Sequence, residues 1–416
     1  MSGEESAVNL FSSFKSGRKV LMAGCASLTV GQLFAGSLLD QQQFVSANTA
    51  FAFDLMSRVT QAQPDANVFI SPFSVSSVLQ MTGNGAASVT KSEMQQVLKT
   101  AGLSAGSLNA AFKDLNQQFA ARKDVTLNLA NGLWFQQGFH LKPAFVGDNQ
   151  KYFQAELAGV DFDNSQSAKT INTWADRQTK GKIKEVVQYP FPPLTRLILA
   201  NAIYFKGNWV TPFKKNLTGP RDFHLVNGQS KQTPMMAQGG HFVYQETPDF
   251  QAVKLPYKGG LQMELFLPST NSTPQKLVAD FATKVNWQKN IETGFSDREG
   301  FVILPKFKME YSVELNETLK ALGMNSAFAG NADFSGIAAE PLFIGEVRQK
   351  SFVDVNETGT EAAAVTTVTM VGKASSMPRP DLFRMILDRP FFFVISDMAS
   401  GSILFMGMVN EPTSGD

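Results

Sequence analysis

The sequence predicts one large domain of the α+β class, built around extensive and mostly antiparallel sheets. Helix-period patterns gather early in the chain and strand-like runs gather late, which is typical of that class. The 416 residues are 43% hydrophobic and include 35 phenylalanines, enough to fill an extensive core. No linker, charge block or low-complexity tract interrupts the chain from about residue 44 to the end, so its length does not require a second domain.

Helical periodicity marks six segments. The first would be capped by Ser46 and repeats Phe51, Leu55 and Val59; the second is a buried helix after Pro72; and the third begins with a capping box of Thr90 and Glu93. The fourth runs through Leu108, Phe112, Leu115 and Phe119, the fifth starts at residue 170 and stops before Gly181, and the sixth runs through Leu315, Leu319 and Leu322.

Strand patterns mark six further segments. These lie at residues 125–135, 196–205, 261–268, 304–311, 391–397 and 402–409. The segment 196–205 is mostly apolar, so we expect a long central strand, and the last two segments suit an antiparallel pair joined by a short turn.

The charge balance limits the partners. The formal net charge is +1, and clusters such as Lys214–Lys215 are small and suit a solvated surface. Phosphate binding needs concentrated lysine and arginine, so the sequence predicts no nucleic-acid partner. We expect a monomer.

Residues 1–43 form an N-terminal extension of different character. Three basic residues, Lys15, Arg18 and Lys19, precede the uncharged run 20–39 and then small residues, the order of a secretory signal peptide. The run is also long enough for an uncleaved membrane anchor, and the stretch before Cys25 has a short lipobox-like pattern. We expect export to the extracellular space, with anchoring through residues 20–39 as the alternative. Cys25 is the only cysteine, so no disulfide is expected.

No pattern in the chain predicts catalysis or metal binding. The three histidines, His140, His224 and His241, lack metal-ligand spacing, and there is no G-x-S-x-G elbow, P-loop or dinucleotide glycine pattern. The S-x-x-K match at Ser88–Lys91 lacks its companion motifs. We therefore expect no enzyme activity, no metal and no cofactor.

The segment 357–377, ETGTEAAAVTTVTMVGKASSM, has the composition of a strand and the length of a functional loop. Its first half is rich in Ala, Val and Thr, and the segment contains no proline. It is too long for an ordinary connection and too apolar for a disordered linker.

Several motifs together resemble one family. These are NVFISPFSVSSVLQM, INTWADRQTKGKI, LILANAIYFKGNW, LPKF, VDVNETGTEAAA and DRPFFFVI followed by GSILFMGMVNEP. In this order they resemble the serpins over residues 44 to 412, within an expected domain of residues 44–416. The resemblance implies three sheets, about nine helices and an exposed reactive loop at about 357–379. In inhibitory members a target protease cleaves this loop, which then inserts into the central sheet and carries the acylated protease with it.

The resemblance implies a hinge at the start of the loop. Its residues are Glu357, Gly359, Thr360, Glu361, Ala362, Ala363 and Ala364. Side chains alternate along a strand, so Thr360, Ala362 and Ala364 would share the inner face and Glu361 and Ala363 the solvent face. About a dozen inserted residues, each gaining ~1 kcal/mol in hydrogen bonds, would release on the order of 10 kcal/mol.

The reactive bond follows by counting along the family's loop. Fourteen residues after Gly359 comes Lys373, followed by Ala374. The basic residue resembles the antithrombin loop and would suit a trypsin-like serine protease, whose pocket pairs the ammonium with an aspartate. A shifted bond at Met370 or Met377 would suit other proteases.

The family's sheet-opening region corresponds to Ser71, Ser74, Asn201, Gln349 and Lys350. Where the family usually has histidine, this chain has Gln349, which removes any pH sensitivity of that side chain. We expect Gln349 to bridge to Ser74 and Asn201 by hydrogen bonds. The helix through Leu108 carries Lys113 and little other positive charge, so heparin binding is unsupported.

Two other functions compete with inhibition. A non-inhibitory serpin, acting as carrier, chaperone or storage protein, typically has a hinge spoiled by charged or bulky residues or proline, and Thr360–Ala364 shows no such disruption. A serine hydrolase would need a motif that the chain lacks.

Overall fold

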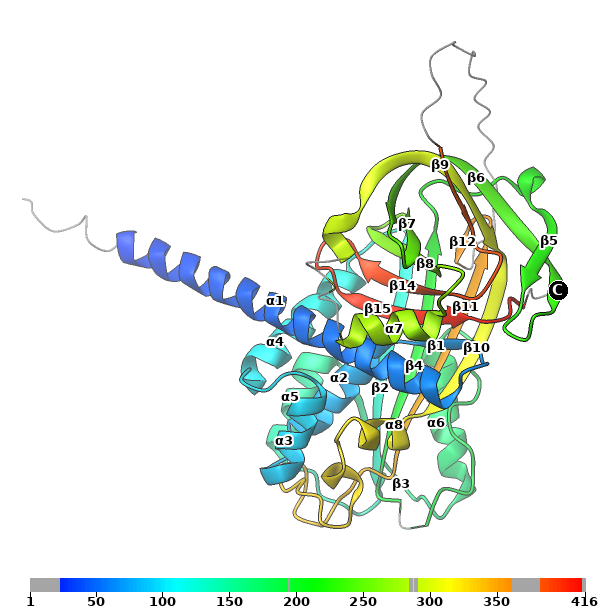
Figure 1. Ribbon diagram of the computed structural model, residues 1–416. Coiled ribbons are helices and arrows are strands. Elements are labelled where there is room, and N and C mark those ends of the chain that lie inside the picture. The colour runs from blue at the N-terminus through cyan, green and yellow to red at the C-terminus, as the bar shows by residue number, and fades with distance from the viewer. Residues whose placement is uncertain (1–22, 194, 284–286, 288–290, 361–381, 414–416) are drawn as a thin grey trace, which may run out of the picture.

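The computed structural model describes the chain except residues 1–22, 194, 284–286, 288–290, 361–381 and 414–416. The described residues contain eight α-helices, against the roughly nine implied by the resemblance, and fifteen strands (Figure 1). The helices are α1 (Ala23–Ala62), α2 (Pro72–Gly83), α3 (Ser88–Val97), α4 (Ala105–Ala120), α5 (Pro143–Phe153), α6 (Ser165–Gln178), α7 (Pro274–Thr283) and α8 (Asn316–Ala321). The strands are β1 (Val68–Ile70), β2 (Val125–Gln136), β3 (Glu156–Val160), β4 (Leu197–Asn208), β5 (Gly219–His224), β6 (Ser230–Glu246), β7 (Phe250–Pro256), β8 (Leu261–Pro268), β9 (Ser296–Pro305), β10 (Phe307–Glu314), β11 (Glu346–Asn356), β12 (Gly359–Thr360), β13 (Phe383–Ile386), β14 (Phe391–Asp397) and β15 (Ile403–Val409).

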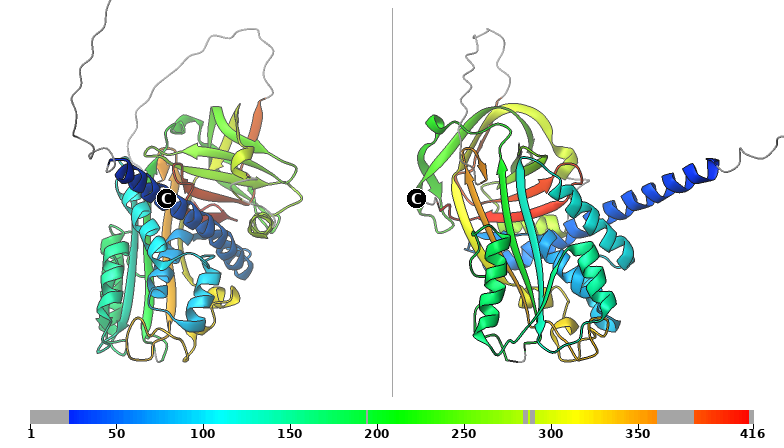
Figure 2. Two further views of the ribbon diagram at one scale, coloured as in Figure 1. Left: turned by 90° about the vertical axis from the view of Figure 1, so that its left-hand side faces the viewer. Right: turned by 180° about the vertical axis from the view of Figure 1, so that it is seen from behind.

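The six-stranded sheet has the order β10-β11-β12-β4-β2-β3, and β11 also pairs directly with β4. Its central strand β4 is buried on both faces, which confirms the strand expected over 196–205. Ile198 and Ala200 pack with α6 on one face, while Leu199 and Ile203 join the main core on the α2 side. Figure 2 shows α6 on one side of this sheet and the α2–α5 group on the other.

The nine-stranded sheet has the order β1-β15-β14-β8-β7-β6-β9-β13, with β5 on β6. β14 and β15 pair antiparallel, as the sequence predicted. Three sheets were expected, but the described strands join into two. The reason is β6, whose 17 residues pair with β5, β7 and β9 along different parts of its length.

Two local expectations were wrong. Ser46 does not cap a helix, because α1 runs without interruption from Ala23 to Ala62, and the described side chains of α1 become buried from Phe44 onward. Thr90 and Glu93 form no capping box, since α3 begins earlier, at Ser88. Thr90 instead accepts a hydrogen bond from the backbone of Asp333.

The N-terminal half of α1 projects away from the rest of the molecule (Figure 1). Among the described residues, no helix combines the length and the apolar character that crossing a membrane would need.

Candidate functional site

The candidate site lies where β11 and β4 separate. The two strands pair in parallel from Glu346 opposite Ile198 to Phe352 opposite Tyr204. Beyond that point β12 lies between them, and Thr360 is opposite Val355 of β11 and Gly207 of β4, antiparallel to both. The chain therefore reverses after Asn356 and starts a new strand inside the sheet.

The reversal depends on Gly359. Its φ is +151°, and a Cβ at this position would lie 2.1 Å from the carbonyl oxygen of Gly207. Only glycine tolerates both this backbone conformation and this close approach of β4. The predicted hinge glycine therefore has a steric role where the new strand begins.

Glu357 anchors the reversal. Its carboxylate lies 3.1 Å from Lys306 Nζ, and its carbonyl oxygen accepts a hydrogen bond from the N–H of Phe213 at 2.8 Å. Burial alone would raise the pKa of Glu357, but its own backbone N–H and the Lys306 ammonium hold that pKa below its usual value. The Trp209 indole N–H donates to the Asn356 carbonyl at 3.0 Å and closes the other side of the turn.

Thr360 points into the protein. Its side chain is fully buried, and its hydroxyl lies 2.7 Å from the hydroxyl of Tyr257. The Tyr257 ring stacks on Trp209 at 4.2 Å between centroids. Burial raises the pKa of Tyr257, and the hydrogen bond with Thr360 partly offsets that rise. The structure thus places Thr360 on the inner face, as the expected alternation requires.

The other predicted loop residues cannot be placed. Glu361, Ala362, Ala363, Ala364, Lys373 and Ala374 lie outside the described residues.

A buried network of neutral side chains lies below the new strand. Gln349 of β11 donates to Asn201 Oδ1 of β4 at 2.9 Å, and its amide oxygen accepts the N–H of Ser71 at 2.8 Å. Asn201 donates in turn to Ser74 Oγ and, at 2.7 Å, to Asn131 Oδ1. Gln349 therefore bridges directly to Asn201 as expected, but it reaches Ser74 only through Asn201.

Two residues of this region differ from the sequence prediction: Asn131 belongs to the buried network but was not predicted, and Lys350 was predicted but lies outside the network. Asn131 shares the core-facing side of β2 with the partly buried Leu127 and Leu129, and it donates to Ser77 Oγ at 2.9 Å. The signal for Asn131 was its position two residues after Leu129, where the strand alternation places a polar side chain on the apolar face and so requires a buried hydrogen-bond partner. Lys350 points away from the network and pairs with Glu310 at 2.8 Å, because neighbouring strand residues face opposite sides.

The described residues hold no group of three or more His, Cys, Asp or Glu side chains that could bind a metal ion. The site therefore consists of two features. The short strand β12 lies between β11 and β4, and further along the sheet the Gln349–Asn201 hydrogen bond joins β11 directly to β4, so a longer inserted strand would have to break it.

Comparisons with known proteins agree with this geometry. A family model described as serpin (serine protease inhibitor) matches residues 46–412. A serpin-like protein of Thermococcus kodakarensis is 37% identical over 381 residues, covering 90% of this chain and 87% of that protein. The leukocyte elastase inhibitor of Homo sapiens is 38% identical over 390 residues, covering 89% of this chain and 100% of that protein.

A solved structure shows the same similarity. The crystal structure of mouse protein-Z dependent protease inhibitor matches with a TM-score of 0.80 at 29% identity, covering 91% of this chain and 99% of that one. The two-sheet fold, the strand begun between β11 and β4, and matches over most of the chain lead to one conclusion: this protein belongs to the serpin family.

Proposed function

We propose that this chain is a suicide-substrate inhibitor of a trypsin-like serine protease, which it traps by inserting its cleaved loop between β11 and β4. The observation that carries the proposal is β12. Gly359 and Thr360 already pair on both sides as the first residues of that strand would, and Thr360 is already buried.

Hydrogen-bond arithmetic supports further insertion. Each step would replace one β11–β4 contact by two contacts, one to each flanking strand. The net gain is one strand-to-strand ladder, about one hydrogen bond for each inserted residue, and each hydrogen bond is worth about 1 kcal/mol. The bridge from Gln349 to Asn201 crosses this path and would have to break, which opposes spontaneous insertion.

The trypsin-like target rests on Lys373, which the sequence places at the reactive bond with Ala374. The human relative is named for elastase, a different protease. Cleavage at Met370 or Met377 would be the corresponding alternative in this chain.

The test is incubation with trypsin, followed by denaturing electrophoresis. We expect a covalent complex that survives denaturation, whereas a non-inhibitory serpin would be cleaved without forming one. Lys373→Ala should slow association with trypsin at least about tenfold, or about 1.4 kcal/mol in activation free energy. An unchanged rate would place the reactive bond elsewhere.

We further propose that the protein is exported and acts outside the cell. The support is the basic flank and uncharged run of the N-terminal extension. Mass spectrometry of the exported protein's N-terminus would distinguish cleavage of the extension from a retained anchor.

A further inference from the structure

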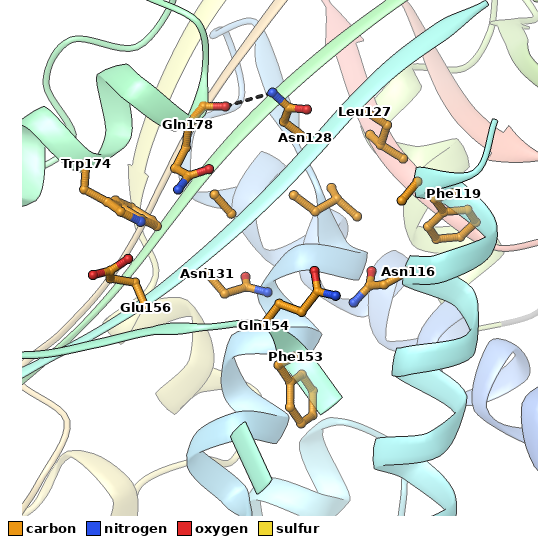
Figure 3. A pocket seen from close by; sticks show the side chains of 13 residues that line it. Asn116, Phe119, Leu127, Asn128, Asn131, Phe153, Gln154, Glu156, Trp174 and Gln178 are labelled. Carbon is orange, nitrogen blue, oxygen red and sulfur yellow. Dashed lines mark hydrogen bonds between the residues drawn. The ribbon is translucent and has the colours of Figure 1, made fainter. Parts of the chain in front are cut away.

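A hollow of about 260 Å³ lies against β2, between α4 and α6 (Figure 3). Leu127 and Leu129 from one face of β2 line it, and so do Asn128 and Ala130 from the other face. Side chains of both faces can border one hollow only if that hollow lies along the edge of the strand. The hollow is therefore an edge site rather than a pocket beneath the sheet.

The strand edge is open at this place. β3 pairs with β2 only over Gly132–Gln136, so the preceding residues 125–131 pair with β4 alone. Alternate residues of that stretch direct backbone N–H and C=O groups outward, where no described strand meets them. Gln154, which follows the last residue of α5, and Glu156, the first residue of β3, close the end of the hollow.

Side-chain amides with unused hydrogen-bonding capacity surround this edge. Among the described residues, the amides of Asn116, Gln154 and Gln178 have no hydrogen-bond partner for their side chains. Figure 3 shows the amides of Asn116 and Gln154 pointing into the hollow from opposite sides. Asn128 donates to the Gln178 carbonyl at 2.9 Å and keeps its own amide oxygen free to accept.

The lining restricts the ligand's chemistry. No lysine or arginine lines the hollow, and its one carboxylate, Glu156, lies 3.8 Å from Arg177, so an anion finds no site there. Trp174, Phe119 and Phe153 are at most 4% exposed and offer no ring face on which a sugar could stack. Amides and a free strand edge instead match the alternating donors and acceptors of an extended peptide.

We propose that this hollow, the β2 edge site, binds a short extended peptide with small uncharged side chains, which adds a strand to β2 in line with β3. Bound there, the peptide would join α4, β2 and α6. This part of the inference rests on the proposed function: opening of the sheet between β11 and β4 must move β2 with β4, so an occupant tied to α4 should slow insertion of the loop.

Hydrogen exchange of the intact protein, without protease, tests the site directly. The probe is acetyl-Ala-Thr-Ser-Ala-amide at millimolar concentration, with a backbone N-methylated peptide of the same sequence as control. We expect exchange of residues 125–131 to slow about threefold or more with the first peptide and to stay unchanged with the second, which cannot donate to the edge. Protection of residues 198–204 and 346–352 instead would mean that the peptide enters between β4 and β11 and would overturn the proposal.

Variants localise the effect. Asn116→Phe fills the hollow and should abolish the protection, whereas Gln117→Phe, an equal change at the next and exposed residue of α4, should leave it intact. If Asn116→Phe fails to fold, Gln178→Ala removes one amide without adding bulk and should weaken the protection severalfold. Protection unchanged by Gln178→Ala and Asn116→Phe, or equal protection by maltose, would refute the peptide site.

With the site established, the first peptide should raise the number of inhibitor molecules consumed per trypsin molecule. If no complex with trypsin forms at all, the proposed function fails while the exchange result on the site still stands.

Discussion

The polar groups that join β11 to β4 differ in kind from those buried in the nine-stranded sheet. In the six-stranded sheet, the network that joins β11 to β4 consists of Gln349, Asn201, Ser71, Ser74 and Asn131, all neutral. The nine-stranded sheet instead buries ion pairs between neighbouring elements. The buried carboxylates of β11 and the turn after it, Glu346 and Glu357, pair with Arg348 and Lys306 rather than across to β4.

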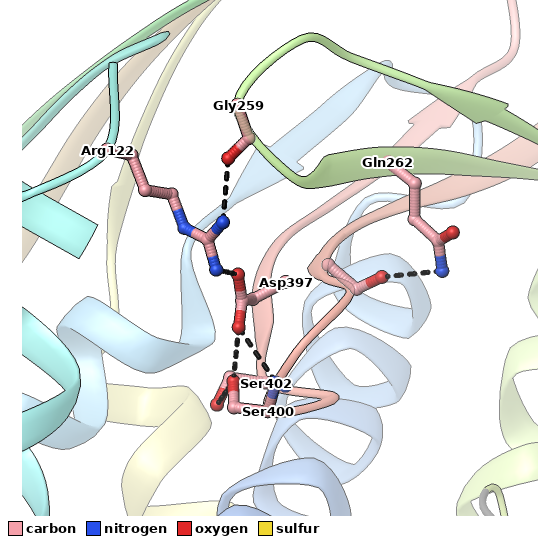
Figure 4. A network of polar contacts seen from close by, with 7 residues as sticks. Arg122, Gly259, Gln262, Asp397, Ser400 and Ser402 are labelled. Atoms are coloured by element: carbon pink, nitrogen blue, oxygen red, sulfur yellow. Dashed lines mark hydrogen bonds and ion pairs between the residues drawn. The ribbon is translucent and has the colours of Figure 1, made fainter. Parts of the chain in front are cut away.

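One of these ion pairs joins Arg122, just after α4, to the fully buried Asp397 at the end of β14 (Figure 4). Arg122 also donates to the Gly259 carbonyl at 2.7 Å, and Ser400 donates to Asp397 through its N–H at 2.8 Å and its hydroxyl at 2.7 Å. A second cluster on β7 and β8 holds Lys254 3.6 Å from the buried Glu264, with Glu292 bound to the same ammonium.

The difference fits the proposed function, in which β11 and β4 separate while the nine-stranded sheet stays closed. Separating a buried ion pair leaves uncompensated charges and is strongly destabilising, whereas neutral hydrogen bonds cost about 1 kcal/mol net and can be remade with new partners. Two strands that separate in the proposed mechanism are therefore best joined by amides and hydroxyls, whereas strands that stay paired can be joined by charges. Four substitutions, three of them with a control variant, test this contrast, from the largest expected effect to the smallest.

Placing a charge in the opening sheet should have the largest effect. Thr360→Arg would bury a guanidinium against Tyr257, at a cost of several kcal/mol, so β12 should not form in the intact protein and insertion after cleavage would first have to bury that charge. Cleavage at Lys373 does not require insertion, so deacylation should win and the inhibitor should become a substrate. The measurement is the stoichiometry of trypsin inhibition.

The matched control for that change is Glu361→Arg, which the alternation of an extended chain places on the solvent face. It should keep most of the inhibition. Unimpaired inhibition by Thr360→Arg would rule out insertion as the mechanism.

Breaking an ion pair of the closed sheet should destabilise the fold without changing the mechanism. Asp397→Asn leaves the partly buried Arg122 without its counter-charge, so we expect the free energy of unfolding to fall by about 3 kcal/mol in urea denaturation. Glu411→Gln breaks the exposed pair with Lys231 and should cost less than about 1 kcal/mol. Equal losses would show that burial of the first pair is unimportant.

The cluster around Glu264 should make stability depend on pH. Burial and the nearby Glu292 carboxylate raise the pKa of Glu264 to about 7, while Lys254 and the Ser396 hydroxyl, 2.5 Å away, act in the opposite direction. The folded state therefore holds this proton more tightly than the unfolded state. The resulting stability is complete below the unfolded pKa of 4.5 and is lost as the pH rises through 7.

Glu264→Gln mimics the protonated side chain and should remove this loss. Relative to the variant, the wild type should lose about 2 kcal/mol of unfolding free energy between pH 5 and 8. Thermal unfolding of both proteins across that range is the measurement. A constant difference between them would mean that Glu264 does not titrate there.

The smallest effect compares two neighbours on β11. Gln349→Ala leaves Asn201 and the Ser71 N–H without their partner and should cost about 1–2 kcal/mol, whereas Lys350→Ala breaks only an accessible pair with Glu310 and should cost under about 0.5 kcal/mol. Since the Gln349 network contains no titratable group, the Gln349→Ala loss should not vary between pH 5 and 8, unlike that of Glu264. A pH-dependent loss would contradict the contrast between the sheets.

Local sequence patterns foresaw much of this molecule. The apolar run of β4, the β14–β15 pair, the glycine at the hinge and the bridge from Gln349 to Asn201 all follow from spacing, residue type or resemblance. These features depend on neighbours along the chain or on one steric requirement at one residue.

Other features depend on partners far away in the sequence. Glu93 has the spacing of a cap but accepts hydrogen bonds from the backbone N–H and the hydroxyl of Ser326. Ser46 has the residue type of a cap, yet α1 continues through it. The merging of the expected three sheets into two depends on the register along β6, which no local pattern specifies.

The short strand β12 has a kinetic consequence. The first step in forming an inserted strand is slow, because it orders the chain before enough hydrogen bonds form to offset the lost conformational entropy. In this protein the first residue pairs of the inserted strand form when the protein folds, since Gly359 and Thr360 already lie between β11 and β4. After cleavage, insertion would only have to extend this existing strand. The slow step that competes with deacylation would then be the breaking of the Gln349–Asn201 hydrogen bond, not the nucleation of the strand.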